Sequence, residues 1–288
     1  MEFFKPFQGF NSYMKIGIVI KNEALKGDER LLSLLRQLEQ ESYDVYELNS
    51  KSDLRSGTDL VLCVGGDGTF IQAAQHVADV GIPILGVNLG RLGFLSENSP
   101  EAVVPALMSG EFSIEYRTML NATVKGRNAR KDIGLLPYAV NEVSVHRKGL
   151  AVLGIHVKVN GETLPTYWAD GLLVATATGS TAYSLSVGGP ICMPDAKVLI
   201  ITPIAPHNLN VRPLVVPESA EIEISFSARD DKAILTMDNQ TVEIDTDWTV
   251  KVQVAQFSLK RIRLSKSEFV NALTSKLFWG EDIRNTEN

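Results

Sequence analysis

The sequence predicts a two-domain protein, in which an α/β domain with a parallel sheet precedes an all-β domain built as an antiparallel sandwich. The chain has 288 residues, which is long enough for two domains that each bury a core of their own. Short apolar strands alternate with helix-like segments in the first third, and strand follows strand after about residue 113. Hydrophobic residues make up 44% and charged residues 22%, as is typical of globular proteins.

The first domain, residues 1–113, is expected to hold a Rossmann-like parallel sheet with helices on both faces. Leucines repeat at helical spacing in Asp28–Glu41, which predicts an amphipathic helix. Further helices are predicted at Thr69–Val80 and Pro100–Ser109, and strands at Lys15–Ile20, Val45–Leu48, Leu60–Val64 and Pro83–Val87. Ligands of such sheets bind beyond the carboxyl ends of the strands, where Gly65–Thr69 and the glycine-rich loop Asn88–Phe94 both fall.

The second domain, residues 114–267, is expected to be antiparallel because many strands follow one another with turn residues between them. Asn160-Gly161 is a typical hairpin turn between two of these strands. Strands are predicted at Leu120–Lys125, Tyr138–Val145, Ile155–Val159, Glu162–Thr166, Leu172–Ala175, Glu221–Ser227, Ile234–Met237, Val242–Ile244, Val250–Ala255 and Arg261–Leu264. Helices are predicted near Ala182–Val187 and over Glu268–Trp279, and the C-terminal tail, residues 268–288, is expected to return to the first domain.

Charge and cysteine content restrict the class of partner. The formal net charge of −6 disfavours nucleic-acid binding. No apolar run approaches the length of a membrane span, so we expect no membrane partner. The segment Met1–Tyr13 lacks the apolar run of a secretory signal and is interpreted as a loose tail, or as a start codon upstream of Met14. Only two cysteines are present, which indicates a reducing, cytoplasmic location.

The segment Val61-Leu62-Cys63-Val64-Gly65-Gly66-Asp67-Gly68-Thr69 carries the strongest functional signal in the chain. An apolar strand ends on two glycines and leads through a third into a helix. Glycines let a backbone approach a ligand closely, and the N–H groups and dipole of a helix N-terminus favour phosphate. Asp67 would repel phosphate unless it binds a metal or removes a proton, so the pattern indicates phosphoryl transfer. The alternative is a structural turn with Asp67 as helix cap.

Three further clusters contain candidate ligand-binding residues. Asn141-Glu142 interrupts a valine-rich strand, and on this pair alone a structural role is favoured. Asp170-Gly171 and the hydroxyl-rich run Thr178–Pro190 could hold diphosphate, ribose or amide groups, although a capped helix with a serine-rich loop would look similar. Met237–Gln240 is typical of a β-turn. The four histidines show no metal-ligand spacing, so no metal-binding side chains are predicted.

Together these segments resemble the NAD kinases, in order and over nearly the whole chain. The matching motifs are GGDGT at Gly65–Thr69, NLGRLGF at Asn88–Phe94, NE at Asn141-Glu142, DG at Asp170-Gly171, TGSTAYSLSVGGP at Thr178–Pro190 and DNQ at Asp238–Gln240. The resemblance implies a phosphotransferase with an alcohol acceptor, in which ATP phosphorylates the 2′-hydroxyl of the adenosine ribose of NAD to give NADP. It also implies a site between the two domains, small nucleotides as partners, and a homo-dimer or homo-tetramer. A divalent metal, Mg²⁺, is expected because phosphoryl transfer requires charge neutralisation.

The resemblance assigns a role to each matched residue. Asp67 would be the general base toward the 2′-hydroxyl, and the phosphates would lie against Gly66, Gly68 and Thr69. Phe94 would line the adenine pocket, Asn141 and Glu142 would hold the ribose, and Asp170 would bind the nicotinamide end. The remaining dinucleotide contacts would come from Thr181, Ala182, Tyr183, Ser184, Leu185, Ser186, Ala205 and Gln240.

Trp168 departs from the family pattern, because many bacterial members have arginine two residues before the aspartate. Its indole is expected to face the dinucleotide, with packing between domains or subunits as the alternative. Two other functions stay open. A lipid kinase of the diacylglycerol or sphingosine type shares GGDGT but should lack the NE and TGSTAYSLS runs. A non-catalytic NADP-binding sensor would keep the pocket, and the presence of Asp67 argues against it.

Overall fold

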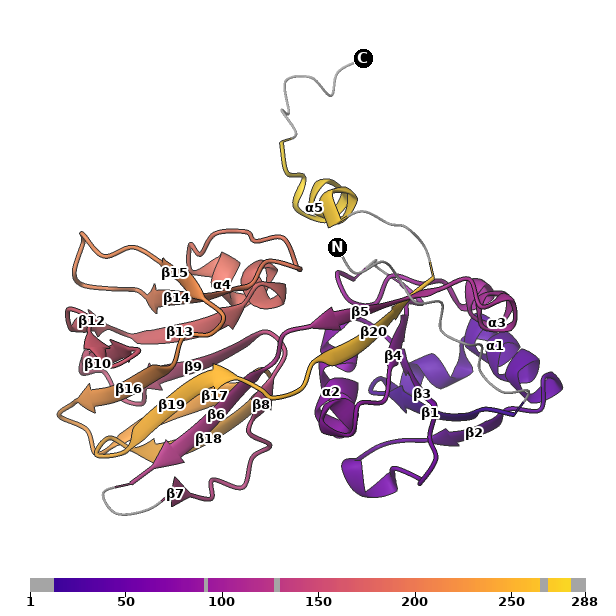
Figure 1. Cartoon of the computed structure of the whole chain (residues 1–288), viewed down its shortest axis with the longest axis horizontal. Helices are drawn as coiled ribbons and strands as arrows, with labels where there is room; N and C mark the ends of the chain where they lie inside the picture. Colours follow the sequence, from indigo (N-terminus) through magenta and orange to yellow (C-terminus); the bar gives the residue numbers. More distant parts are fainter. Residues whose placement is uncertain (1–12, 91–92, 127–129, 265–268, 281–288) are drawn as a thin grey trace. The chain divides into compact units, whose positions relative to one another are not determined.

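The computed structural model describes residues 13–90, 93–126, 130–264 and 269–280, and its chain divides into two compact units (Figure 1). The first unit contains the described residues up to Tyr116 together with those from Lys260 onward. The second unit is Arg117–Leu259. Within the described residues, no helix is both long enough and apolar enough to cross a membrane.

The first unit is built on a six-stranded sheet in the order β2-β1-β3-β4-β20-β5. Strands β1 to β4 are parallel, and β20 adds to the sheet parallel to β4. Every residue of β3 is buried, as expected for a parallel strand covered on both faces. The strands are β1 Lys15–Ile20, β2 Asp44–Glu47, β3 Leu60–Val64, β4 Ile84–Val87, β5 Ser113–Arg117 and β20 Leu259–Arg263.

Helices cover both faces of this sheet. Helix α1, Glu29–Gln40, is capped by Asp28, whose carboxylate accepts the N–H of Arg30, and it buries leucines spaced three and four residues apart. Helices α1 and α3, Pro100–Ser109, share one apolar core with the sheet, and α2, Asp67–Val77, lies on the opposite face (Figure 1). Short 3₁₀ turns form at Glu23–Gly27, Lys51–Asp53 and Ala78–Val80, and helix α5 spans Phe269–Leu277.

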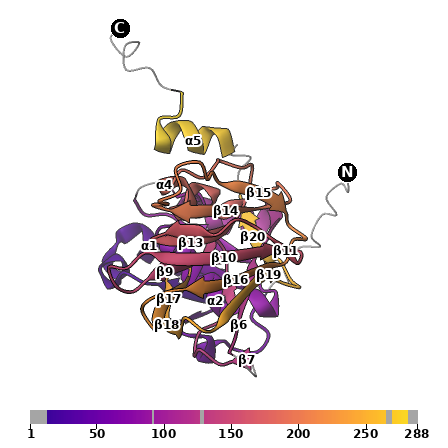
Figure 2. The same cartoon turned by 90° about the vertical axis from the view of Figure 1, so that its left-hand side faces the viewer.

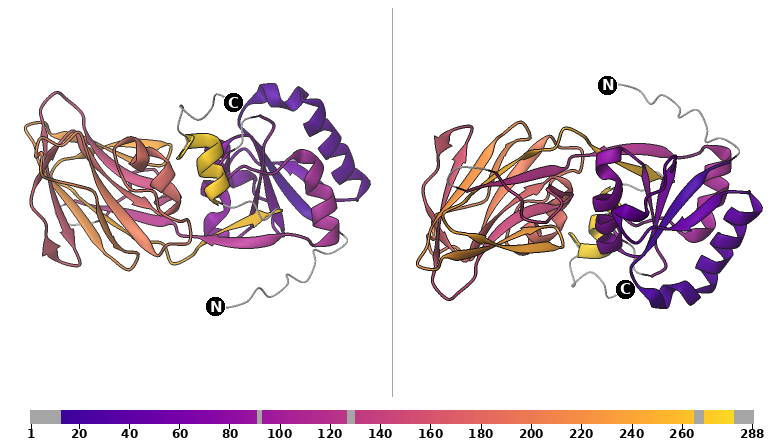
Figure 3. Two further views of the ribbon diagram at one scale, coloured as in Figure 1. Left: turned by 90° about the horizontal axis from the view of Figure 1, so that it is seen from above. Right: turned by 90° about the horizontal axis from the view of Figure 1, so that it is seen from below.

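The second unit consists of two antiparallel sheets whose facing side chains form one large core (Figures 2 and 3). One sheet has the order β11-β10-β16-β19-β6-β7, with β12 on β10 and β8 on β6, and the other has the order β15-β14-β13-β9-β17-β18. The strands are β6 Leu120–Lys125, β7 Arg130–Lys131, β8 Tyr138–Ala139, β9 Glu142–Arg147, β10 Leu153–Val159, β11 Glu162–Thr163, β12 Tyr167–Ala169, β13 Gly171–Thr176, β14 Val198–Ile204, β15 Leu214–Pro217, β16 Ile222–Ser227, β17 Lys232–Met237, β18 Gln240–Asp245 and β19 Thr249–Val254. A 3₁₀ turn, Thr178–Thr181, precedes the short helix α4, Tyr183–Ser186.

The predicted fold class is confirmed, and the Asn160-Gly161 hairpin forms with both residues at positive φ. Three element predictions need correction. The strand expected at Arg261–Leu264 forms as β20, but it belongs to the parallel sheet of the first unit. The strand expected over Tyr138–Val145 is interrupted after Ala139, because the N–H groups of the next residues turn to the carboxylate of Asp238. The helix expected from Thr69 begins at Asp67.

Candidate active site

The Gly65–Thr69 loop joins β3 to α2, and its glycines serve different purposes. Gly65 has φ +144°, and a Cβ on it would approach the hydroxyl oxygen of Thr69 to 2.6 Å, so the turn itself requires glycine. A Cβ on Gly66 or Gly68 would meet no protein atom within 4 Å. The space beside these two residues is therefore open to a ligand. Their N–H groups lie at the positive end of the α2 dipole, which favours an anion.

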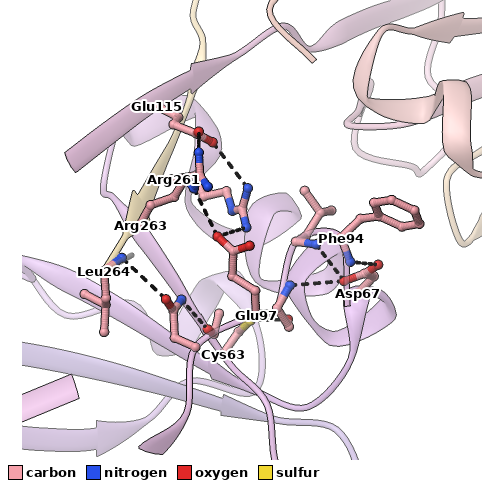
Figure 4. Close-up of polar contacts among 12 residues, drawn as sticks. Cys63, Asp67, Phe94, Glu97, Glu115, Arg261, Arg263 and Leu264 are labelled. Carbon is pink, nitrogen blue, oxygen red and sulfur yellow. Dashed lines mark hydrogen bonds and ion pairs between the residues drawn. The ribbon is translucent and has the colours of Figure 1, made fainter. Parts of the chain in front are cut away.

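The carboxylate of Asp67 is held by the backbone of the loop that follows β4. Its Oδ2 accepts the N–H of Phe94 at 2.8 Å, and its Oδ1 accepts those of Leu95 at 2.8 Å and Ser96 at 3.1 Å (Figure 4). Gly66 occupies the N-cap position of α2, and no side chain caps the helix there, so Asp67 does not cap its own helix. Because each carboxylate oxygen can accept two hydrogen bonds, Oδ2 keeps one acceptor position for a substrate hydroxyl.

Phe94 links this loop to the C-terminal helix. Its ring lies 6.0 Å from that of Phe269, and the ammonium of Lys276 lies 3.9 Å from its centroid. Burial lowers the pKa of Lys276, although the negative charges of Asp67 and Glu97 oppose that shift. Lys276 is a cation near the glycine loop that no sequence motif indicates. The middle of the NLGRLGF motif, residues 91–92, lies outside the described residues.

In the second unit, two acids lie close together, Glu142, which is buried, and Asp238, which is partly buried. Asp238 accepts the N–H groups of Val140, Asn141 and Glu142 at 2.7, 2.8 and 3.2 Å. Burial raises the pKa of Asp238 to about 6 despite these bonds. Burial, with the charge of Asp238, raises the pKa of Glu142 to about 8. The predicted turn is confirmed, with Asp238 at φ +51°, but its use of the carboxylate was not anticipated.

The hydroxyl-rich run packs directly against Asn141-Glu142. The Thr176 hydroxyl donates to the carbonyl of Val140 at 2.7 Å and accepts the N–H of Gly179 at 3.0 Å. A Cβ on Gly179 would lie 2.2 Å from the carbonyl oxygen of Asn141, so the two segments can touch only because residue 179 is glycine. The backbone N–H of Tyr183 bonds to Glu142 and lowers its pKa, against the effect of burial. The structure thus brings the predicted NE and TGSTAYSLS segments together.

Exposure separates the residues of this run into two groups. Ser184 is fully buried, with its hydroxyl 3.5 Å from that of Thr202, so it serves the packing of α4. Tyr183 and Ser186 are exposed, and Thr181, Ala182 and Leu185 are partly exposed. The ring of Tyr183 stacks on His146 at a centroid distance of 6.0 Å. The exposed members are the ones available to a ligand.

Asp170 lies at the other end of the β9–β13 pair. The register places Glu142 opposite Ala175 and His146 opposite Gly171, so Asp170 lies opposite Arg147 and the two acids are separated by five residues, or roughly 17 Å of strand. Arg147 holds Asp170 in a two-point ion pair, with Nε 2.7 Å from Oδ1 and Nη2 3.2 Å from Oδ2. Sequence reasoning missed Arg147, because nothing along the chain indicates the strand pairing that places it there.

Ala205 lies beside Asp170, since the N–H of Asp170 donates to the carbonyl of Ile204 at 3.0 Å. Ala205 is exposed and has φ +46°, a strained conformation for a residue with a Cβ. Such strain concentrates at binding sites, where neighbouring structure maintains it. The ligand contact expected of Ala205 stays a prediction.

Trp168 and Gln240 lie in surroundings that the sequence did not indicate. The Trp168 ring covers Gly154 on β10, where a Cβ would approach it to 2.9 Å. The ring is 43% exposed and lines a cavity of about 420 Å³ with Arg229. The amide of Gln240 faces the backbone of Leu136 and accepts its N–H at 3.3 Å. The ligand contacts expected of both residues stay predictions.

The described residues contain no group of three or more histidine, cysteine, aspartate or glutamate side chains that could hold a metal ion. Asp67, with an open acceptor position beside a phosphate-binding loop, fits a hard cation that arrives with substrate phosphates and keeps most of its waters.

Comparison with known proteins identifies the relatives of this chain. Residues 18–109 match the family model of the ATP-NAD kinase N-terminal domain, and residues 140–264 match that of the C-terminal domain. The chain is 38% identical to the NAD kinase of Flavobacterium psychrophilum over 262 residues, which cover 90% of this chain and 88% of that protein. It is 40% identical to the NAD kinase of Porphyromonas gingivalis over 231 residues, or 78% of each.

Two solved structures share the fold. Yeast NADH kinase complexed with NADH aligns with a TM-score of 0.84 at 23% identity, covering 96% of this chain and 90% of the yeast chain. An NAD kinase from Archaeoglobus fulgidus in complex with ATP aligns with a TM-score of 0.74 at 24% identity, covering 92% of this chain and 99% of the archaeal one.

Proposed function

This chain belongs to the NAD kinase family, and we propose that it transfers the terminal phosphoryl group of ATP to the 2′-hydroxyl of the adenosine ribose of NAD, giving NADP. The observation that carries this proposal is the position of Asp67 at the start of a helix, between two glycines with open space beside them. A phosphate-binding backbone and a proton acceptor occur there in the same turn.

The chemistry proposed for the first unit follows from these groups. The backbone N–H groups around Gly66 and Gly68 bind phosphate oxygens, and Thr69 belongs to the same turn. Asp67 Oδ2 accepts the proton of the attacking 2′-hydroxyl at its open position, and the three backbone bonds keep the carboxylate from rotating. Phe94 offers a ring face to the adenine base. Lys276 adds positive charge near the transferred phosphoryl group.

The second unit supplies the proposed contacts to NAD. Asn141 and Glu142 bind ribose hydroxyls, and Asp170 binds the nicotinamide amide. The exposed parts of Thr181–Ser186 lie along the dinucleotide. The separation of roughly 17 Å between the Glu142 and Asp170 ends suits a ligand with two ribosyl groups joined by a diphosphate.

A divalent cation, Mg²⁺, is proposed as a companion of ATP. When bound, it neutralises negative charge on the phosphate oxygens. The described residues hold no cluster of protein ligands, which fits a cation held mainly by those oxygens and water. We also propose that the protein works in the cytoplasm, an interpretation supported by its two unpaired cysteines, Cys63 and Cys192. The homo-dimer or homo-tetramer is proposed from the family resemblance alone.

The experiment that tests the reaction offers purified protein three acceptors, NAD, diacylglycerol and sphingosine, each with ATP and Mg²⁺. We expect phosphate transfer to NAD alone. Transfer to a lipid would support the lipid kinase alternative, which the family match disfavours. NADP binding without transfer to any acceptor would support the sensor alternative and overturn the proposal.

A further inference from the structure

A cluster of four charged side chains lies near Asp67 in the first unit. Arg261 and Arg263 extend from β20, Glu115 extends from β5, and Glu97 belongs to the loop after β4 (Figure 4). Glu97 Oε1 lies 2.9 Å from Nη2 of Arg261 and 3.0 Å from Nε of Arg263. Glu115 lies 3.2 Å from Arg261 and 2.6 Å from Arg263. Each acid therefore contacts both arginines.

The side chains of this cluster are more buried than those of a surface ion pair. The Arg261 side chain is 3% exposed and that of Glu97 is 11% exposed. Removing charges from water is costly, and apolar residues of similar volume would often serve stability as well or better. Two positive and two negative charges offset each other here. Their directional contacts fix the position of the segment that carries Glu97, which an apolar contact would not do as sharply.

That segment also holds the carboxylate of Asp67. Glu97 directly follows Phe94, Leu95 and Ser96, whose N–H groups all donate to Asp67. The same segment packs on β4, because a Cβ on Gly86 would lie 2.7 Å from the carbonyl oxygen of Leu95. The loop is thus fixed at β4 and at the charged cluster, and it presents its N–H groups between these two attachments.

We propose that Glu97 is a positioning residue for Asp67: its ion pairs with Arg261 and Arg263 hold the 94–96 backbone so that three N–H groups orient the carboxylate toward the acceptor hydroxyl. This inference rests on the proposed function, in which Asp67 accepts the proton of that hydroxyl. Glu97 acts through the loop and touches neither substrate. The C-terminal strand β20 thereby contributes to turnover, although its sequence contains no motif of the site.

Glu115 provides a matched control, because it contacts the same two arginines but is distant along the chain from the 94–96 backbone. Glu97→Gln and Glu115→Gln each remove one negative charge from the cluster. Amide hydrogen exchange of residues 93–98, measured without nucleotide, reports directly on the loop. We expect at least ten-fold faster exchange in Glu97→Gln and less than a two-fold change in Glu115→Gln.

Steady-state kinetics give the second readout. We expect Glu97→Gln to lower kcat about ten-fold or more with both KM values within two-fold, whereas Glu115→Gln keeps kcat within two-fold. If Glu97→Gln does not fold, Glu97→Asp keeps the charge with a shorter reach, and its loop exchange should rise at least three-fold. Unchanged exchange in the Glu97 variants, or equal increases in both glutamine variants, would overturn the proposal. Failure of the proposed function would appear separately, as wild-type protein that forms no NADP.

Discussion

Replacing Glu142 by glutamine should change how the stability of the ligand-free protein depends on pH. The Glu142 side chain is 8% exposed, and its Oε2 has no hydrogen-bond partner among the described residues. Burial and the nearby Asp238 raise its pKa from 4.5 to about 8. In this pH range the folded protein therefore binds a proton that the unfolded chain releases. Folding stability falls as the pH rises from about 4.5 to 8, and the penalty is complete above about 8.

The size of the effect follows from the same pKa values. A pKa difference of this size corresponds to roughly 5 kcal/mol at 1.36 kcal/mol per unit. Part of it is repulsion shared with Asp238, whose own pKa rises to about 6, so removing Glu142 alone should recover about 2–4 kcal/mol at pH 9. Glutamine keeps the shape and cannot ionise. At pH 4 the carboxyl is protonated in both states, so the variant should gain nothing there.

Urea denaturation between pH 4 and 9, without nucleotide, measures this difference. Subtracting the wild-type free energy of unfolding from that of Glu142→Gln cancels the groups that both proteins share. The difference should grow with pH through the window and level off above pH 8. Glu243→Gln is the control, because Glu243 is half exposed and pairs with Lys148, and its difference should stay flat. Parallel curves for wild type and Glu142→Gln would refute the argument.

Five further substitutions test the remaining parts of the site. Gly68→Ala should raise stability by up to about 1 kcal/mol while lowering kcat at least ten-fold, because its Cβ meets no protein atom but occupies ligand space. Gly65→Ala should instead lower stability by about 1–3 kcal/mol. Thermal melts and rate assays check both predictions. Asp170→Ala should raise KM for NAD about ten-fold or more with KM for ATP unchanged, since a charged hydrogen-bond partner is lost. Equal effects on both KM values would contradict the role of Asp170. Arg147→Met, which removes the ion pair with Asp170, should raise KM for NAD by a smaller factor. Trp168→Arg should tighten NADP binding at low salt, because the new charge would lie near the dinucleotide phosphates. A lower melting temperature with unchanged NADP affinity in a titration would show instead that the indole, which covers Gly154, serves packing.

Local pattern was sufficient to predict most of the elements. The buried run Leu60–Val64 and the leucine spacing in Glu29–Gln40 determine strand and helix by themselves. The strand β14 was missed because its apolar run has no alternation and contains Pro203, although burial on both faces explains such a run. Sheet membership was less predictable. Nothing within Leu259–Arg263 shows that it joins β4 and not a strand of the second unit.

The candidate site could be predicted where its residues are contiguous in sequence. Asp67 and the glycines around it were identified because one turn holds the whole pattern. Glu97, Arg147 and Lys276 were not identified, since each reaches its position through pairing or packing with distant segments. Asp238 illustrates the same limit: its turn was predicted, but the three N–H groups that it accepts come from residues nearly 100 positions earlier.

The central claim is that Asp67 accepts the proton of the attacking hydroxyl. The structure gives a second reason to expect a lower kcat in Asp67→Asn. Both carboxylate oxygens accept backbone N–H groups, and in asparagine one of these oxygens is replaced by an NH₂ donor. The direct measurement is kcat for NADP formation by Asp67→Asn at saturating NAD and ATP, with Asp79→Asn as a control, because Asp79 lies beyond the C-terminal end of α2 and pairs with Lys51. The account predicts a kcat about 10²–10⁴-fold below wild type with NADP affinity largely retained. A kcat within two-fold of wild type would contradict it.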